Sequence, residues 1–484
     1  MKCASLTITL LWLLSCDVMA REDEVPADWP DHIRTVLENT YPLEHDRGDR
    51  LPLFLWQARN PGEIGPERTE KLLDELNRRG LGLVSSWDHG DDEATLRRRL
   101  SIARAQTELG LRVNIDATSC LYSFYNGQDD TAHQDDQGTS FWDESSGGKM
   151  GCPFRLEHRI PVIKKRIDEF AQAYQDAGVT VDFVFADWEV DGPFEFNRAH
   201  ETAKRCQVCR KNIPDIDNFN SFQSVFREIR SRLQREAYAE PILGRFPKSL
   251  VMNYGVYPHG GHRYWYDYFE KYVEGQPALA DQEARYCQWH HEFPLTGYTA
   301  AMPVVYTWFA THQWYDFEPG DYRWFYNMLL VSSNVGQHTL RETPIVSFVH
   351  WHTTAPPKNP DPAVRQFSEA MYQELLWHML LRGVDTFFLW CLSEEAEKEI
   401  QLLHPVWAAA QEYGEFLDQG EPTTFDVPTK PGPVVSGLRL GDRVLVRRTD
   451  FGEARSDEDI EVLVGERKLT VPLGTGHCQI LRLQ

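Results

Sequence analysis

Two acidic residues separated by one position follow a strongly apolar stretch near the middle of the chain. Asp187 and Glu189 come directly after residues 181–186, which read Val-Asp-Phe-Val-Phe-Ala. Successive side chains of a β-strand point to opposite faces, so residues two apart share a face. We therefore expect the two carboxyl groups to lie side by side where this strand ends.

A pair of adjacent carboxyl groups has a definite chemistry. Neighbouring carboxylates disfavour joint ionisation, so one of them keeps its proton to higher pH. A protonated carboxylic acid beside an ionised one is the combination that cleavage of a glycosidic bond requires. The alternative without chemistry is an acidic turn that caps a helix or forms salt bridges. Because unpaired charges are costly to bury beside an apolar strand, the pair indicates an O-glycosyl hydrolase.

Aromatic and acidic side chains also end other apolar stretches of the chain. Aromatic rings offer flat faces to sugars, and carboxylates accept hydrogen bonds from sugar hydroxyls. The alternative is that the aromatic residues only close the end of the core and the acids only hold loops. The candidates for substrate binding are Asp88, Asp116, Tyr254, Tyr306, Trp351 and Trp390.

The histidines and cysteines predict neither a metal nor a cofactor. Cys206 and Cys209 form a Cys-x-x-Cys pair with His200 as the nearest further ligand, whereas a structural zinc site needs four ligands. We therefore expect a local disulfide or two ordinary thiols there. The sequence also lacks His-Glu-x-x-His, Gly-x-Ser-x-Gly and phosphate-loop motifs, which argues against metalloprotease, serine hydrolase and nucleotide chemistry.

Eight short apolar stretches, each followed by helical or loop sequence, must position these residues. They cover residues 51–56, 80–87, 111–116, 181–187, 249–254, 302–306, 344–351 and 384–390. Alternation of strands and helices predicts parallel pairing with right-handed crossovers, and continuous apolar strands fit a sheet covered on both faces. Eight such units close into a TIM-type (β/α)8 barrel, which carries its active site at the carboxyl end of the strands.

Both ends of the chain differ from this pattern. Residues 1–20 resemble a secretory signal peptide, with a positive start, a short apolar run and a small-residue cleavage site. The alternative is a lipoprotein signal cleaved before Cys16, which would then carry a lipid anchor. Either predicts a secreted, periplasmic or cell-surface protein without a membrane span. We assign the barrel to residues 21–420 and a small antiparallel, β-sandwich-like domain to residues 421–484, which contain short alternating strands.

The apolar strand with its acidic end resembles a known motif. Asp187-Trp188-Glu189 is similar to the Asp-Trp-Glu of hyaluronidases and, more loosely, to the Asp-x-x-Asp-x-Asp-x-Glu motif of chitinase-like (β/α)8 glycoside hydrolases. Asp182 fits the longer motif, and Phe185 replaces its middle aspartate with an apolar residue, as hyaluronidases do. Shorter similarities occur at residues 253–258 and 383–390, although Cys391 stands where the family has glycine.

This resemblance implies retaining hydrolysis assisted by the substrate. Glu189 would be the general acid and base, and the 2-acetamido group of the sugar would be the nucleophile. Asp187 would orient that group and stabilise its charge. Tyr306 would hydrogen bond to the acetamido oxygen, and Trp390 would form the floor of the sugar site.

Two alternatives remain open from the sequence. The nucleophile or base could be a second protein carboxylate, for which Glu342 and Glu394 are candidates, or the barrel could bind glycans without cleaving them. The chain has 50 Lys and Arg against 73 Asp and Glu, a net charge of −23, which argues against a nucleic-acid partner. The same charge would repel a polyanion such as hyaluronan. We therefore expect a poly- or oligosaccharide substrate, and the sequence does not identify the glycan.

Overall fold

The computed structural model describes most of the chain. The described residues are 25–121, 129–144, 149–187, 197–260, 262–264, 286–288, 290–306, 317, 320–351, 364–451, 458–473 and 476–484. Residues 1–20, which the sequence predicts to be a signal peptide, lie outside these ranges, as do Trp188 and Glu189. Within them, no helix combines the length and the apolar character that crossing a bilayer requires.

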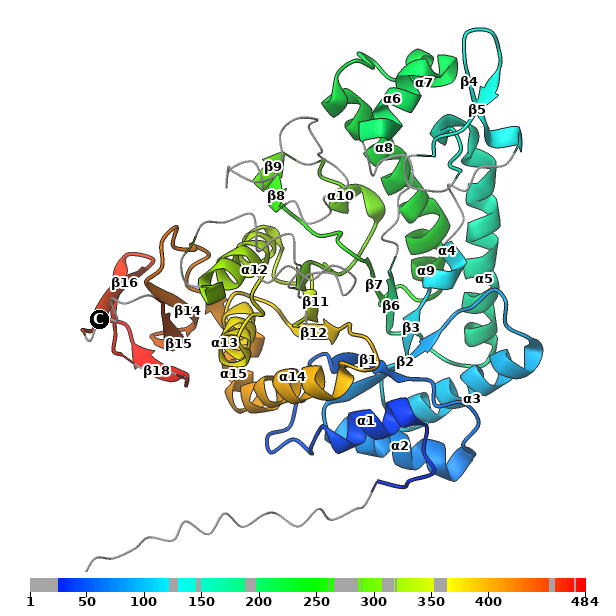
Figure 1. Cartoon of the computed structure of the whole chain (residues 1–484). Coiled ribbons are helices and arrows are strands. Elements are labelled where there is room, and N and C mark those ends of the chain that lie inside the picture. Colours follow the sequence, from blue (N-terminus) through cyan, green and yellow to red (C-terminus); the bar gives the residue numbers. More distant parts are fainter. Residues whose placement is uncertain are drawn as a thin grey trace, which may run out of the picture.

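Eight parallel strands form one sheet in the order β10-β11-β12-β1-β2-β3-β6-β7 (Figure 1). They are β1 (Leu53–Arg59), β2 (Leu81–Ser86), β3 (Asn114–Asp116), β6 (Phe183–Ala186), β7 (Leu250–Asn253), β10 (Val304–Tyr306), β11 (Val346–His350) and β12 (Thr386–Leu389). Each strand falls within or overlaps one of the eight apolar stretches, so the prediction of eight parallel strands is confirmed.

Aromatic contacts across the sheet show that it is curled. The rings of Phe54 on β1 and Phe183 on β6 stack at 4.3 Å, although two strands lie between them. Phe185 on β6 and Phe388 on β12 meet at 4.5 Å across three intervening strands. In a flat sheet these pairs would be about 14 Å and about 19 Å apart. The sheet therefore wraps around a core of phenylalanines.

The two edges of the curled sheet, β7 and β10, meet without a ladder in the described part of the chain. Single hydrogen bonds connect them instead: the Thr299 N–H donates to the Val251 carbonyl and the Met302 N–H to the Val256 carbonyl, both at 3.1 Å. The prediction is thus confirmed as far as a curled sheet of eight parallel strands with helices, and closure of this sheet into a complete (β/α)8 barrel stays a prediction.

Helices cover the outside of the sheet. They include α2 (Pro66–Arg78), α3 (Glu93–Glu108), α5 (Ile160–Asp176), α8 (Phe219–Gln234), α12 (Gly320–His338), α13 (Glu369–Leu380) and α14 (Ala396–Ala410). Asp92 caps α3 by accepting a hydrogen bond from the Thr95 N–H at 2.7 Å. Pro405, a residue type that favours the first turn of a helix, lies inside α14.

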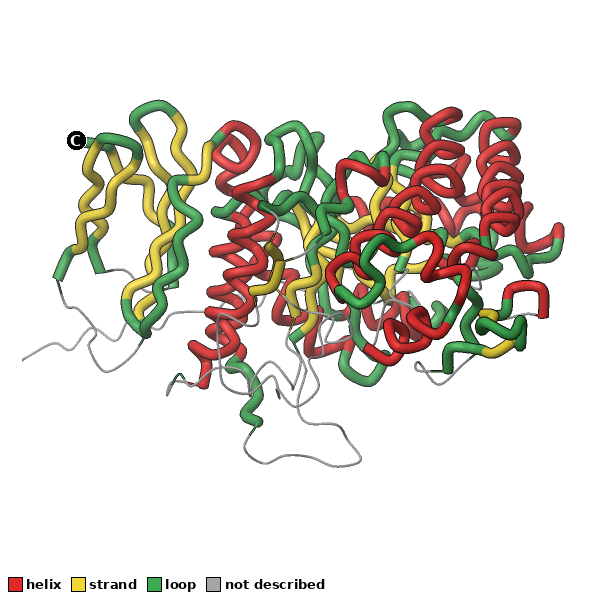
Figure 2. The backbone as a smooth tube through the Cα atoms, turned by 90° about the horizontal axis from the view of Figure 1, so that it is seen from above, coloured by secondary structure: helices red, strands yellow, loops and turns green. Residues whose placement is uncertain are grey.

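The C-terminal strands form an antiparallel sheet and a hairpin, as predicted. The sheet has the order β13 (Glu421–Pro422), β14 (Pro433–Leu440), β15 (Arg443–Asp450) and β18 (Gln479–Arg482), and the hairpin joins β16 (Ile460–Val464) to β17 (Arg467–Val471). Figure 2 shows these strands at one end of the molecule, with helices between them and the parallel sheet. That residues 421–484 are a separate domain stays a prediction.

Buried polar groups attach the C-terminal sheet to α13. Arg447 on β15 donates two hydrogen bonds to the Glu374 carboxylate, at 2.8 and 2.5 Å. His378, one turn along the helix, lies 2.8 Å from the Ser436 hydroxyl and 3.0 Å from the Thr449 hydroxyl. This interface is thus built from matched charges and hydroxyls rather than from apolar contact alone.

Candidate active site

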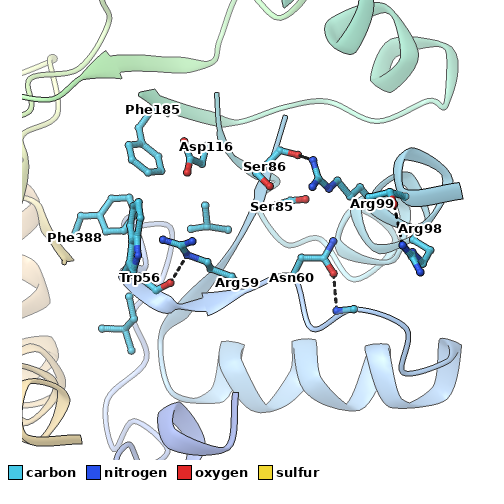
Figure 3. Close-up of a pocket in the computed structure, with 14 residues that line it drawn as sticks. Trp56, Arg59, Asn60, Ser85, Ser86, Arg98, Arg99, Asp116, Phe185 and Phe388 are labelled. Carbon is cyan, nitrogen blue, oxygen red and sulfur yellow. Dashed lines mark hydrogen bonds between the residues drawn. The ribbon is translucent and has the colours of Figure 1, made fainter. Parts of the chain in front are cut away.

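A pocket of about 280 Å³ lies at the carboxyl ends of β1, β2 and β3 (Figure 3). Trp56 and Arg59 come from β1, and Asp116 is the last residue of β3. Phe185 and Phe388 of the phenylalanine core also line the pocket. The pocket is therefore at the end of the strands where the sequence placed the site.

Thr118 connects the two aspartates that end β3 and β6. Its backbone N–H donates to a carboxylate oxygen of Asp116 at 2.9 Å, and its hydroxyl accepts a hydrogen bond from the Asp187 N–H at 2.8 Å. Burial raises the pKa of Asp116, while the Thr118 bonds and the Arg59 charge oppose that rise. Asp116 is therefore a carboxyl group that holds a proton more readily than an exposed aspartate.

Arg59 provides a positive charge to both aspartates. Burial lowers the pKa of this guanidinium, and the charges of Asp116 and Asp187 counteract the shift. The guanidinium lies over the Trp56 ring at 3.6 Å from its centroid, and its Nε donates to the Trp56 carbonyl at 2.6 Å. The cation is thus held in place by its own strand, facing two carboxylates that belong to different strands.

Three of the predicted aromatic residues form a wall beside this cluster. The hydroxyls of Tyr254 and Tyr306 lie 2.9 Å apart, and the rings of Tyr306 and Trp390 stack at 6.3 Å. Phe348 contacts both tyrosines and Phe388, which lines the pocket. The aromatic wall is therefore continuous with the pocket through the phenylalanine core.

Trp351 is held by hydrogen bonds at the edge of this wall. Its indole N–H donates to the Phe367 carbonyl at 2.8 Å, and its backbone N–H donates to the buried Glu399 carboxylate at 2.9 Å. Glu399 also lies 3.0 Å from His350 Nδ1 and, with Glu395, forms a group of ligand-type side chains. Since these bonds already occupy Glu399, it anchors the loop after β11.

The remaining predicted residues lie elsewhere. Asp88 accepts hydrogen bonds from the Gly90 N–H at 3.0 Å and the Ser119 hydroxyl at 2.8 Å, which lower its pKa, so it holds the loop after β2. Glu342 is exposed and precedes β11, at the opposite end of the sheet from Asp187. The sequence offered Glu342 as a partner of Glu189, which lies outside the described residues, so that alternative stays a prediction. Glu394 is exposed after β12 and does not line the pocket.

Sequence reasoning missed Trp56 and Arg59. The signal that identified Asp116 and Asp187 applies to them as well, because both stand where the apolar stretch of β1 gives way to polar residues. Their pairing with aspartates more than fifty residues away depends on the curl of the sheet. A second group of ligand-type side chains, His133, Cys152, Cys206 and Cys209, gathers outside the pocket.

Comparison with known proteins gives no family assignment. No family model and no curated protein matches the chain. Among solved structures, it is similar to the GH36 α-galactosidase AgaA of Geobacillus stearothermophilus, with 11% identity and a TM-score of 0.43 over 93% of this chain and 58% of that one. The chain thus spans a little over half the length of this α-galactosidase.

Two further solved structures match over similar lengths. Amy13B of Eubacterium rectale has 11% identity and a TM-score of 0.40, over 89% of this chain and 90% of that one. An endo-β1,6-glucanase has 10% identity and a TM-score of 0.37, over 90% and 91%. Likenesses of this size carry no argument about the activity of this chain, so function has to be argued from its own residues.

Proposed function

We propose that the chain is a glycoside hydrolase that cleaves a poly- or oligosaccharide at the carboxyl end of its parallel strands. The observation that carries the proposal is the cluster of Asp116 and Asp187, joined through Thr118 and facing Arg59, beside an aromatic wall. A pocket with convergent polar groups, a perturbed carboxyl pKa and aromatic faces is what recognition and cleavage of a sugar need.

The proposed mechanism is retaining and uses the 2-acetamido group of the substrate. Glu189 gives its proton to the glycosidic oxygen while the acetamido oxygen attacks the anomeric carbon and the glycosidic bond breaks. Asp187 stabilises the positive charge that develops on the acetamido nitrogen. Water then opens the cyclic intermediate and gives its proton to Glu189, which restores the acid.

The described residues have supporting roles in this scheme. Tyr306 would donate its hydroxyl to the acetamido oxygen, and its contact with Tyr254 orients that hydroxyl. Trp390, stacked on Tyr306, would carry the apolar face of the sugar. Arg59 and Asp187 interact electrostatically, so Arg59 would help to hold the Asp187 carboxylate in position.

In a second candidate mechanism, a carboxylate of the protein replaces the 2-acetamido group of the substrate as the nucleophile or base. Asp116 lines the pocket and shares Thr118 and Arg59 with Asp187, so it is placed to act where the acetamido group would otherwise act. This enzyme would also cleave sugars that carry a 2-hydroxyl group. Its stereochemical outcome would follow from the separation of the two carboxyl groups, about 5–5.5 Å for retention and about 6.5–9.5 Å for inversion.

The experiment compares aryl 2-acetamido-glycosides with their 2-hydroxy counterparts. We expect hydrolysis of a 2-acetamido substrate, and a loss of about 10²–10⁴-fold in kcat for Glu189→Gln with glycan binding retained. The exposed Glu394→Gln serves as the matched control and should keep full activity. Cleavage of 2-hydroxy substrates supports the second candidate. Glycan binding by the unaltered chain without hydrolysis of either substrate class contradicts both and leaves a binding protein.

We also propose that the chain is exported by residues 1–20. The proposal predicts a mature N-terminus after Ala20, or a lipid-modified Cys16, in the secreted or cell-surface fraction. N-terminal sequencing and mass measurement of the mature protein distinguish these two products. Protein found inside the cell with residues 1–20 still attached would contradict export.

A further inference from the structure

Four ligand-type side chains converge in the loops above the sheet, away from the pocket. His133, Cys152, Cys206 and Cys209 are all buried, and their ligand atoms lie within 4.8 Å of one another. The sulfur of Cys152 lies 3.7 Å from that of Cys209 and 3.9 Å from that of Cys206. His133 Nδ1 lies 3.9 Å from the Cys209 sulfur.

These distances do not fit disulfides. A disulfide requires about 2.05 Å between sulfurs, and the three cysteines are free thiols in the structure. Of the two alternatives that the sequence offered for Cys206 and Cys209, a disulfide or two thiols, the structure has the thiols. Three thiols and an imidazole, packed together without stronger partners, need another explanation.

The same distances fit the edges of a tetrahedron around zinc. A zinc–sulfur distance of about 2.3 Å gives sulfur–sulfur edges of about 3.8 Å, and a zinc–nitrogen distance of about 2.0–2.1 Å gives sulfur–nitrogen edges of about 3.6 Å. We propose that His133, Cys152, Cys206 and Cys209 bind one Zn²⁺ in a closed, structural site. Thiolates and imidazole select zinc over calcium or magnesium, and four protein ligands leave no position for substrate.

Basic residues flank the proposed site. Three thiolates and one zinc ion leave a net charge of −1, and the Cys-x-x-Cys pair is flanked by Lys204, Arg205, Arg210 and Lys211. Lys204 pairs with Glu201 and Arg210 with Asp136. Arg205 lies over the Phe141 ring at 4.5 Å, and the same ring stacks on His133 at 5.4 Å. Arg205 is therefore the cation that these contacts connect to the cluster, where it opposes the negative charge that burial penalises.

The site would fasten together the two loops that leave the sheet at the pocket aspartates. His133 on β4 (His133–Gln134) and Cys152 belong to the loop after β3, which begins at Asp116. Cys206 and Cys209 belong to the loop after β6, which begins at Asp187. Figure 1 shows β4, β5 (Ser140–Phe141), α6 (Asn197–Arg205) and α7 (Gln207–Asn212) grouped at this point. Zinc would thus supply a cross-link between these two long loops.

The first test uses the unaltered full-length chain, purified without chelator. Metal analysis should find about one zinc ion per chain, released when a mercurial reagent blocks the thiols. X-ray absorption at the zinc edge should show three sulfur ligands at about 2.3 Å and one nitrogen at about 2.0–2.1 Å. A chain that stays free of zinc after dialysis against it overturns the proposal, as does a different ligand set or a Cys206–Cys209 disulfide in peptide maps.

The second test uses variants. Cys209→Ser should lose zinc and lower the thermal midpoint, and chelation of the unaltered chain should lower the midpoint in the same way. Cys391→Ser and Cys478→Ser remove thiols far from the cluster and should keep zinc in full. Equal zinc content in Cys209→Ser and in these controls would overturn the site. If Cys209→Ser does not fold, the absorption measurement on the unaltered chain decides alone.

Discussion

The pocket and the interface between α13 and the C-terminal sheet both bury charged groups, but they arrange them differently. At the interface, Arg447 and Glu374 match each other with two hydrogen bonds, and the Thr449 hydroxyl donates a third to the same carboxylate at 2.6 Å. Beside the pocket, the Arg59 guanidinium faces the carboxylates of Asp116 and Asp187 and contacts the Trp56 ring. Arg447 and Glu374 thus match one to one, whereas Arg59 faces two carboxylates.

This difference separates a structural role from a chemical one. A matched buried pair fixes the position of two elements, and its partners have little reason to change protonation. A carboxyl group such as Asp116, whose pKa is raised by burial and only partly restored by its neighbours, exchanges a proton more readily. We therefore expect substitutions in the pocket to change activity and substitutions at the interface to change stability.

The largest expected effect is on activity, from a change at Asp187, beside the pocket. Asp187→Asn keeps the shape and the Thr118 hydrogen bond to its backbone N–H but removes the charge that stabilises the transition state. Loss of one such electrostatic contribution costs about 10²–10³-fold in kcat. Steady-state kinetics with the preferred glycoside measure it, and the unfolding midpoint should stay unchanged. If Asp187→Asn unfolds the protein and spares activity, the distinction between the two regions fails.

The next effect is on stability, from a change at the interface. Glu374→Leu leaves Arg447 buried without its carboxylate and should cost about 3–5 kcal/mol of unfolding free energy. The matched control is the double variant Glu374→Leu with Arg447→Met, which removes both charges and should recover most of the loss. Urea denaturation measures both, and kcat of the folded protein should not change. Equal destabilisation in the single and double variants would contradict the matched-pair interpretation.

The smallest effect is a change in the dependence of stability on pH. Burial, followed by the charges of Arg382 and Arg447, lowers the pKa of His378 well below 6.5. The unfolded chain therefore takes up this proton first, so stability is complete above about pH 6.5 and falls as the pH drops below it. His378→Gln should reduce that fall. Burial also lowers the pKa of His404, to about 4, so His404 adds its own loss of stability at low pH. The measurement is therefore the difference in unfolding free energy between His378→Gln and the parent, determined by urea denaturation at several pH values.

Asp116 should change the pH dependence of stability in the opposite direction to His378. Its pKa is raised in the folded protein, so its contribution to stability is present at low pH and is lost as the pH rises through the folded value. The parent protein should therefore lose some stability as the pH rises, and Asp116→Asn should make this loss smaller. If the two variants changed stability in the same direction with pH, the opposed electrostatics of the two regions would be wrong.

Local patterns were enough to predict the strands of the parallel sheet. The eight apolar stretches became the eight parallel strands because a strand covered on both faces must be apolar along its length. The helix α12 was not predicted, because it is buried almost all round and so has no amphipathic period.

The sequence by itself determined the strands, the C-terminal antiparallel region and the positions of Asp116 and Asp187 at strand ends, since each depends on residues close together in the chain. Only the tertiary structure decided that Arg59 faces both aspartates, that Glu342 lies at the opposite end of the sheet from Asp187, and that His133 and Cys152 join a Cys-x-x-Cys pair more than fifty residues away. These depend on how the sheet curls and how its long loops meet, and such contacts leave no periodic trace in the sequence.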